Sequence, residues 1–325
     1  GTNGIWVGKF ETSYDEETFT NKDTFLTKNP NYAHAKDSSK IIVKPNVRSL
    51  TLRKVSAFYT LSKNTNEELN SHMMTNMEWG AVSYLTYSVY GKCNSTSCEE
   101  VYINNVNTGY LNDTQKFTNQ WQYGTTITGC SGETANAAVM SNTNSCESGN
   151  TYIEAKASTT GNITGIYDMS GGNWEYVMGV ITINNKLVSG GHNRWNSGFN
   201  GIYGAPGNND SDATILEKTD GIDYPDSRYY NLYSYKYELK TDNWYDYTIG
   251  LLGDATKEIA NTKINSTIGN RGLWFSDNAY FPSAVSPWIR RGGRYVDGSF
   301  SGIFQFTRGL GAENCNDAFR IVLAY

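Results

Sequence analysis

The residues that could bind a zinc or redox metal ion are few in this chain, and their spacing does not suit a metal site. The three histidines, His34, His72 and His192, lie far apart, so no pair has the i, i+4 spacing of a helical metal motif. None of the five cysteines belongs to a C-x-x-C pair. Because zinc sites use such paired ligands, the sequence predicts no zinc centre, and we expect the histidines to be surface or capped residues.

Two glutamates that each adjoin a tryptophan are candidates for catalytic acids. Glu78 and Glu175 each adjoin a tryptophan, and two such acids could form a glycosidase pair. The alternative, which we favour, is that both are hydrogen-bond partners within the scaffold. The chain has no G-x-S-x-G elbow and no Walker loop, and the segment GLGAEN lacks the last glycine of a dinucleotide fingerprint. We therefore predict that the protein is not an enzyme.

Four of the five cysteines fall between residues 93 and 146, in a stretch rich in Gly, Ser, Thr and Asn. We expect at least one disulfide among them, Cys130 with Cys146 or Cys93 with Cys98. Disulfides persist in oxidising compartments, so this pattern favours an extracytoplasmic location. Cys315 is then left without a partner.

The composition favours a loop-rich exterior and a binding surface. Charged residues make up 18% of the chain and aromatic residues 14%, with 24 tyrosines. Tyr, Ser, Gly and Asn are the residues that binding surfaces favour, although an ordinary β-rich secreted domain would share this composition. The formal net charge is −5 and no basic run is present, which excludes nucleic acid as an expected partner. Oxygen ligands abound in the Asp- and Asn-rich segments, so a structural calcium ion could bind, but no other cofactor is expected.

No stretch approaches 18 consecutive apolar residues, so we expect no membrane span. The chain opens at Gly1 without a signal peptide, and we expect any export or anchoring segment to lie outside this sequence.

Two helices and two strands are predicted from hydrophobic periodicity. Residues 4–12 alternate as a strand does, and residues 44–64 read as a helix entered at Pro45 and Asn46. Residues 74–91 predict a second helix that is capped by Thr75 or Asn76 and stops at Gly91. Its expected buried face consists of Met77, Ala81, Leu85 and Val89. A glycine-rich turn after residue 165 leads into an apolar, β-branched run, which predicts a buried strand.

The segments between these elements are predicted to be loop insertions on one domain that spans residues 1–325. The first runs from about 93 to 160 and the second from about 184 to 262, and neither has a regular pattern. No repeat, heptad or hinge-like linker divides the chain.

Four anchor motifs resemble a known family. They are TNMEWGAVSYLTYSVYG, GIYDMSGGNWEYVMG, IRRGGRY and AFRIVL, and together they are similar to the formylglycine-generating-enzyme type of C-type lectin fold, an α+β fold. With YINN at residues 102–105 and TGCSG at 128–132, the chain looks like the variable proteins of diversity-generating retroelements. In that branch a reverse transcriptase mutates adenine-templated codons at the end of the gene. The resemblance implies a ligand-binding protein displayed outside the cell, on a bacterial surface or pilus or on a phage tail.

The resemblance places a variable region at about residues 288–323, where a regular framework alternates with unrelated side chains. The expected framework consists of Gly292, Gly293, Tyr295, Gly298, Gly302, Phe304, Phe306, Gly311, Phe319 and Arg320. Because alternate residues of a strand face opposite sides, inward Phe304 and Phe306 would turn Ile303, Gln305 and Thr307 outward. The predicted ligand-binding residues are Arg290, Arg294, Val296, Asp297, Phe300, Ile303, Gln305, Thr307, Arg308, Leu310, Glu313, Asn314, Cys315, Asn316 and Asp317. We expect Arg290, Arg294 and Phe300 to be the energetic anchors for an unknown protein or glycan ligand.

Two alternatives to a diversified binder remain open at the level of sequence. One is a glycan lectin or adhesin of fixed specificity. The other is a metal-dependent oxidase, because the founding member of the fold oxidises a cysteine with copper held by two cysteines. The C-terminal half of this chain offers only Cys315, which argues against that chemistry.

Overall fold

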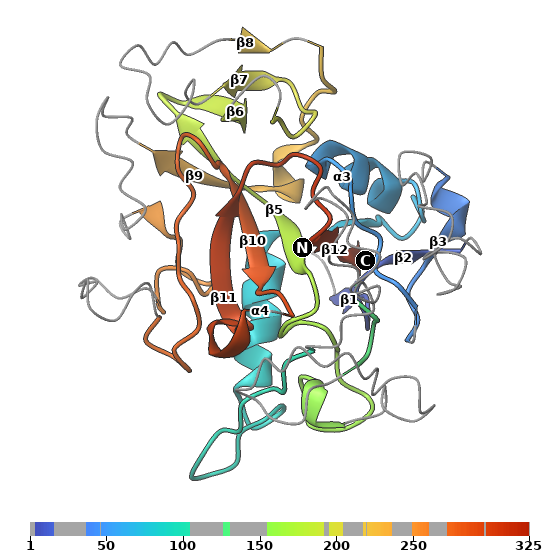
Figure 1. The fold of residues 1–325 in the computed structure, drawn as a ribbon, viewed down its shortest axis with the longest axis vertical. Helices are drawn as coiled ribbons and strands as arrows, with labels where there is room; N and C mark the ends of the chain where they lie inside the picture. The colour runs from blue at the N-terminus through green and yellow to red at the C-terminus, as the bar shows by residue number, and fades with distance from the viewer. Residues whose placement is uncertain are drawn as a thin grey trace, which may run out of the picture.

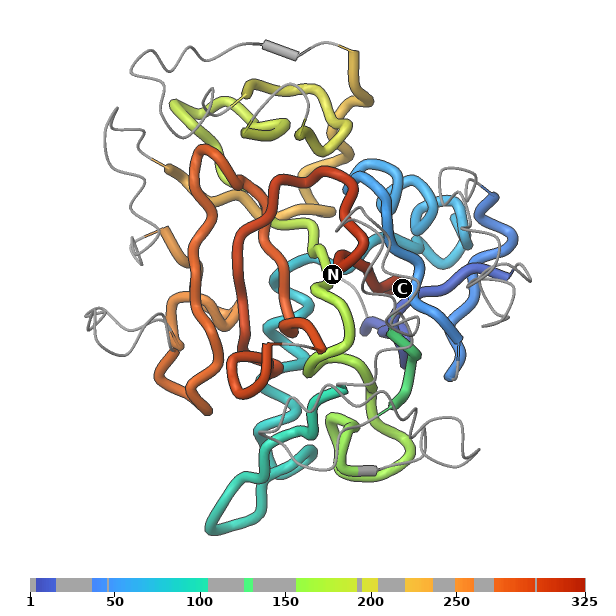
Figure 2. The backbone as a smooth tube through the Cα atoms, in the orientation of Figure 1, coloured from blue at the N-terminus to red at the C-terminus, as the bar shows by residue number. Residues whose placement is uncertain are grey.

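The computed structural model describes residues 4–15, 37–45, 47–104, 126–130, 155–191, 195–203, 217–218, 220–235, 249–259, 272–295 and 297–324. Within these residues the α-helices are α3 (Val55–Lys63) and α4 (Asn76–Thr86), and the 3-10 helices are η2 (Ser38–Lys40), η7 (Ala155–Ala157), η8 (Ser227–Tyr229) and η10 (Gly298–Phe300). The strands are β1 (Ile5–Val7), β2 (Ser13–Tyr14), β3 (Ile41–Ile42), β4 (His72–Met73), β5 (Trp174–Ile183), β6 (Lys186–Gly190), β7 (Gly201–Tyr203), β8 (Glu217–Lys218), β9 (Asn231–Tyr235), β10 (Trp288–Gly292), β11 (Gly302–Gly309), β12 (Asp317–Phe319) and β13 (Ile321–Ala324). The fold is therefore mixed α+β and mostly sheet, as predicted (Figures 1 and 2).

The main sheet is organised around β5, the strand predicted after residue 165. Its strand order is β11-β10-β5-β6-β7-β8, and β9 and β12 each pair in parallel with β5. Figure 1 shows β10 and β11 side by side, with α4 near them. The Trp79 indole on α4 donates a hydrogen bond of 2.8 Å to the carbonyl of Ile303 on β11, which joins helix and sheet.

A smaller sheet brings the two ends of the chain together. β13 lies between β1 and β4, and Ile5, Trp6 and Val7 pair with residues 324, 323 and 322. The two chain ends are close to each other in Figure 1. The first strand is shorter than the predicted residues 4–12, although the amide of Gly8 still donates to the carbonyl of Ile321 at 2.8 Å.

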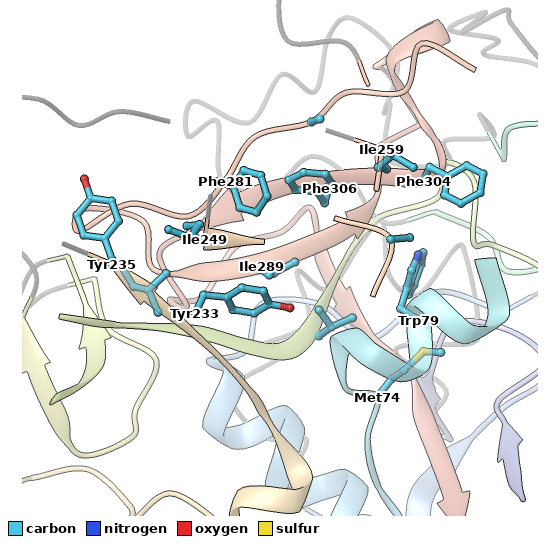
Figure 3. Close-up of a cluster of buried hydrophobic side chains, with 14 of the residues drawn as sticks. Met74, Trp79, Tyr233, Tyr235, Ile249, Ile259, Phe281, Ile289, Phe304 and Phe306 are labelled. Carbon is cyan, nitrogen blue, oxygen red and sulfur yellow. The ribbon is translucent and has the colours of Figure 1, made fainter. Parts of the chain in front are cut away.

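β5 is buried on both faces because two hydrophobic cores flank it. The α4-side core contains Trp79, Phe304 and Phe306, and Figure 3 shows these rings together. The α3-side core contains Phe58 and Trp288. Alternate β5 residues enter the two cores: Val177, Ile181 and Ile183 on the α4 side, and Tyr176, Met178 and Val180 on the α3 side. A strand covered on both faces reads as a continuous apolar run, as this one does.

Helix α4 begins as predicted, but it buries a different face. Thr75 caps it in a capping box with Glu78, and the helix ends at Thr86 instead of Gly91. The predicted apolar face is largely exposed, since Met77, Ala81, Leu85 and Val89 lie outside the core. The buried residues are Asn76, Trp79, Gly80, Val82, Ser83 and Thr86.

Of the helix predicted for residues 44–64, only the second half is helical, because the residues before Val55 pair with distant segments of the chain. The amide of Leu50 donates to the carbonyl of Thr12 at 2.9 Å, and that of Leu52 donates to Asn314 at 3.0 Å. These long-range bonds take the place of helical ones, so α3 begins at Val55.

The second region predicted to be irregular carries part of the main sheet. Asn184 and Asn185 have φ values of 50° and 63°, and they turn β5 back into β6. Two residues with positive φ are typical of a two-residue hairpin turn. β9 then pairs with five consecutive residues of β5, so this region is joined to the main sheet.

The predicted disulfide between Cys93 and Cys98 is confirmed. Cys130 is also disulfide-bonded, while Cys146 lies outside the described residues. Cys315 is buried. Among the helices that the structure describes, none combines the length and apolarity needed to cross a membrane.

Candidate functional site

A cleft of about 410 Å³ lies beside the first half of β10 and the end of β11, and along the loop that follows β11. Seven of the predicted ligand-binding residues line it: Arg290, Thr307, Arg308, Leu310, Glu313, Asn314 and Asp317. They come from three strands, β10, β11 and β12, and from the loop after β11, which the main sheet brings to the same place. The structure thus gathers about half of the predicted residues around one concave site.

Aromatic side chains from other parts of the chain complete the cleft. Trp174 opens β5, Trp195 follows β6, and Tyr280 precedes β10. None of the three was predicted as a ligand-binding residue. Trp174 lies within a recognised motif, GIYDMSGGNWEYVMG, so a signal for it existed, whereas nothing in the sequence around Trp195 or Tyr280 marks them.

Arg290 is held on three sides by the scaffold. Its guanidinium lies 3.7 Å from the centre of the Trp174 ring. Its Nη1 donates to Oδ1 of Asp317 at 3.0 Å, and its Nη2 donates to the carbonyl of Arg308 at 2.6 Å. Only 13% of the Arg290 side chain and 1% of the Asp317 side chain are exposed. Burial raises the pKa of the Asp317 carboxyl, and the Arg290 charge opposes that rise.

Arg294 contacts the same tryptophan from the following loop. Its guanidinium lies 4.0 Å from the Trp174 ring centre, and its Nη2 donates to Oδ1 of Asp297 at 2.9 Å. Both side chains of this pair are partly exposed. Trp174 therefore carries two stacked guanidinium groups, a geometry in which cation–π attraction adds to the ion pairs.

Two buried donors at the cleft lack hydrogen-bond acceptors. They are the indole Nε1 of Trp174 and the Nε of Arg290. Both nitrogen atoms are themselves buried, so they lie within the wall of the cleft and not on its open surface.

Five predicted residues are buried, although two of them, Thr307 and Asp317, still form part of the cleft wall. The five are Ile303, Gln305, Thr307, Cys315 and Asp317. The alternation argument correctly placed Phe304 and Phe306 in the core, but it assumed that β11 has one face in water. Ile303 instead belongs to the same core as the two phenylalanines. Residues 278–280 also pair along the outer edge of β11, where the amide of Phe306 donates to the carbonyl of Asn278 at 3.0 Å.

The remaining predicted residues lie outside the cleft. Phe300 is exposed, and Asn316, Arg294 and Asp297 are half-buried, but none of these four lines the cleft. Val296 lies outside the described residues.

Glu78 and Glu175 are hydrogen-bond partners of the scaffold, as we favoured. Glu78 Oε2 accepts from the amide of Thr75 at 2.8 Å, and its Oε1 lies 2.9 Å from Nε2 of the buried His72. Glu175 is bound by Arg320, whose Nε donates to Oε2 at 3.0 Å. Burial raises the pKa of Glu175 to about 7, although the Arg320 charge opposes the shift.

Glu175 belongs to a buried cluster of three acids around one arginine. Glu11, Asp168 and Glu175 are all buried, and burial raises the pKa of each carboxyl. Glu11 does not contact Arg320 directly, and it accepts hydrogen bonds from Ser49 and from the amide of Asn173. Its pKa lies well above the usual value, because burial and the charges of Glu175 and Asp168 all favour the neutral form.

Among the described residues, no group of three or more His, Cys, Asp or Glu side chains could hold a metal ion. His34 and His192 lie outside these residues. The chain matches no protein-family model, and a search of curated proteins finds no similar one.

Proposed function

We propose that this chain is a displayed, sequence-diversified binding protein that recognises its ligand at the cleft beside β10 and β11. The observation that carries the proposal is the convergence of four accessible residues predicted to vary, Arg308, Leu310, Glu313 and Asn314, on one cleft whose walls include scaffold aromatics. In finer terms, we propose a retroelement variable protein with a C-type lectin fold of the formylglycine-generating-enzyme type. The four anchor motifs support this assignment, and they form β5, α4, β10 and the last two strands.

The loop that carries the exposed cleft residues has a fixed backbone, which a diversified protein needs. Gly311 adopts φ +80°, and a Cβ there would lie 2.6 Å from the Trp288 ring, so no other residue fits without displacing the core. The Gly311 amide donates to the Tyr176 hydroxyl at 2.9 Å. Leu310 and Glu313 on either side can therefore vary without changing the path of the loop.

The proposed activity is recognition without chemistry or a cofactor, at an extracellular, cell-surface or phage-tail location. The ligand-binding residues we retain as variable are Arg308, Leu310, Glu313 and Asn314 in the cleft, with Phe300, Asn316, Arg294 and Asp297 around it. We assign Arg290 and Asp317 to the framework, because they form a buried ion pair.

Sequencing of the surrounding genome tests the diversification. We expect a near-copy of the segment encoding residues 290–323 beside the gene, with differences confined to adenines of the copy. The differing codons should include those of Arg308, Leu310, Glu313 and Asn314 and should spare Phe304, Phe306 and Gly311. An intact genome without such a copy would contradict diversification and would favour a lectin of fixed specificity.

A further inference from the structure

The shape and lining of the cleft describe the kind of ligand it fits. Its volume of about 410 Å³ lies toward the small end of the range of roughly 300–1,000 Å³ for ligand pockets. Trp195 lines the cleft with 37% of its surface exposed, so part of its indole ring can meet a ligand. The aromatic lining suits a compact ligand that has a flat apolar face.

The charges in the cleft balance each other. Two arginines, Arg290 and Arg308, and two acids, Glu313 and Asp317, line the cleft, and Arg290 is already paired with Asp317. Arg308 donates from Nη1 to the Ser283 hydroxyl at 3.2 Å. A strongly charged ligand would find no excess of opposite charge here, so a neutral one is favoured.

Hydrogen-bonding groups surround the aromatic rings. The Arg308 guanidinium and the Asn314 carboxamide line the cleft and offer N–H donors. The exposed Glu313 carboxylate offers an acceptor, and the Asn314 carboxamide lies beside it. Hydroxyl groups serve both kinds of partner, because each can donate and accept.

We propose that the cleft binds a neutral pyranose ring, with the flat apolar face of the sugar on Trp195 and its hydroxyls toward the polar wall. This inference rests on the proposed function and names the ligand class of the same site. No metal ion is needed to hold the sugar, because the side chains of the cleft supply both the aromatic face and the hydrogen-bonding partners.

The test uses the whole chain and simple probes. Binding of the methyl glycopyranosides of glucose, galactose and mannose is measured by ligand-observed NMR, and binding of larger neutral glycans on an array. Trp195→Ala should weaken the affinity about tenfold, because a stacked ring contributes on the order of 1 kcal/mol, whereas Trp195→Phe should retain most of it. Leu310→Trp should block the cleft. Trp6→Ala is the matched control, since Trp6 is 64% exposed and does not line the cleft.

The outcomes separate the ligand class from the proposed function. Loss of glycoside binding in Trp195→Ala and Leu310→Trp, but not in Trp6→Ala, supports the pyranose site. Binding of charged glycans alone, or of no glycan, overturns it. If Leu310→Trp then abolishes binding to a purified protein ligand, the recognition function stands and only the ligand class is wrong. If no ligand of the protein responds to either cleft variant, both proposals fail.

Discussion

Arg290 illustrates how a residue at a variable-looking position can belong to the framework. Its guanidinium stacks on Trp174 and bonds both Asp317 and the Arg308 carbonyl. Asp317 is almost completely buried, so its charge depends on this partner. Removing one member of a buried pair leaves an uncompensated charge, which costs more than the pair itself contributes.

We therefore expect Arg290→Gln to lower the free energy of unfolding by about 3–5 kcal/mol. Arg294→Gln is the control, because the Arg294–Asp297 pair is partly exposed, and its loss should cost about 1 kcal/mol. Adding Asp317→Asn to Arg290→Gln should recover part of the loss. Urea unfolding of the four proteins measures all three differences, and equal losses in the two single arginine variants would show that Arg290 has no special structural role.

Glu11 is the residue at which the buried acid cluster should retain a proton. Arg320 supplies one positive charge to three carboxylates, and it bonds Glu175 directly. The folded pKa of Glu11 is raised above its unfolded value. Its contribution to stability is therefore fully present below the unfolded pKa of about 4.5 and is lost as the pH rises through the folded pKa.

Glu11→Gln should remove this loss of stability at higher pH, since the neutral glutamine side chain imitates the protonated acid at every pH. Its carboxamide oxygen can still accept from the amide of Asn173. Its NH2 group takes the place of Oε2, which accepts from Ser49 Oγ and from Asn173 Nδ2, so the Ser49 hydroxyl must turn to accept and the Asn173 carboxamide must turn to present its orphaned Oδ1. The stability of the variant minus that of the natural chain should increase between pH 4.5 and pH 8 in urea unfolding. Glu68→Gln, at an exposed position, should show a constant difference. A Glu11→Gln difference that stayed constant or fell with pH would mean that Glu11 is ionised in the folded protein.

At the scale of the element, β11 is a core strand that happens to lie in the variable region. Ile303→Ala should cost about 2–5 kcal/mol, because its side chain is fully buried beside Phe304 and Phe306. Phe300→Ala, at an exposed position of η10, should change stability by no more than about 0.5 kcal/mol. Denaturant unfolding of the two variants measures both losses of unfolding free energy. If Ile303→Ala lost as little as Phe300→Ala, Ile303 would be a position that tolerates variation.

Helix α4 shows which part of an element could be predicted from sequence. Its start could, because Thr75 and Glu78 have the spacing of a capping box. Its buried face could not be found by counting apolar residues, because Ser83 and Thr86 are buried. Their hydroxyls donate to carbonyls four residues earlier, at 2.9 Å and 2.7 Å, which removes the cost of burying them.

From the sequence, the candidate site could be predicted only for residues that lie close together along the chain. Leu310, Glu313 and Asn314 follow β11 directly, so a loop beside a framework strand was a sufficient clue. Trp195 and Tyr280 reach the same cleft from distant parts of the sequence through the pairing of the main sheet. Such long-range convergence depends on strand order, which local periodicity does not specify.

At the scale of the whole molecule, the variable region is fixed at both of its ends. At its start β10 pairs with β5, and at its end β13 lies between β1 and β4. Arg320 stands between β12 and β13, and it donates to the carbonyls of Gly8 and Tyr167 as well as to Glu175. The loop from Leu310 to Asn316 is thus held between strands that other parts of the chain lock in place.

This arrangement predicts that substituting all accessible residues of the segment together leaves the thermal stability of the protein nearly unchanged, whereas substituting all its buried residues together does not. Exchange of the solvent-accessible set for other polar or apolar residues should keep the melting temperature within about 4 °C, because each surface change costs little. That set consists of Phe300, Arg308, Leu310, Glu313, Asn314 and Asn316. Exchange of the buried set should abolish cooperative unfolding, because a few buried changes of about 1–5 kcal/mol each exceed a total stability of about 5–15 kcal/mol. That set consists of Ile303, Gln305, Thr307, Cys315 and Asp317.

Thermal unfolding followed by near-UV circular dichroism measures both responses on proteins of equal size and similar net charge. Because both sets lie within residues 300–317, a difference between them cannot come from their position along the chain and must reflect which side chains the core requires. Equal tolerance of the two exchanges would mean that β11 is a display strand after all, whereas equal damage would leave the segment no capacity for diversity.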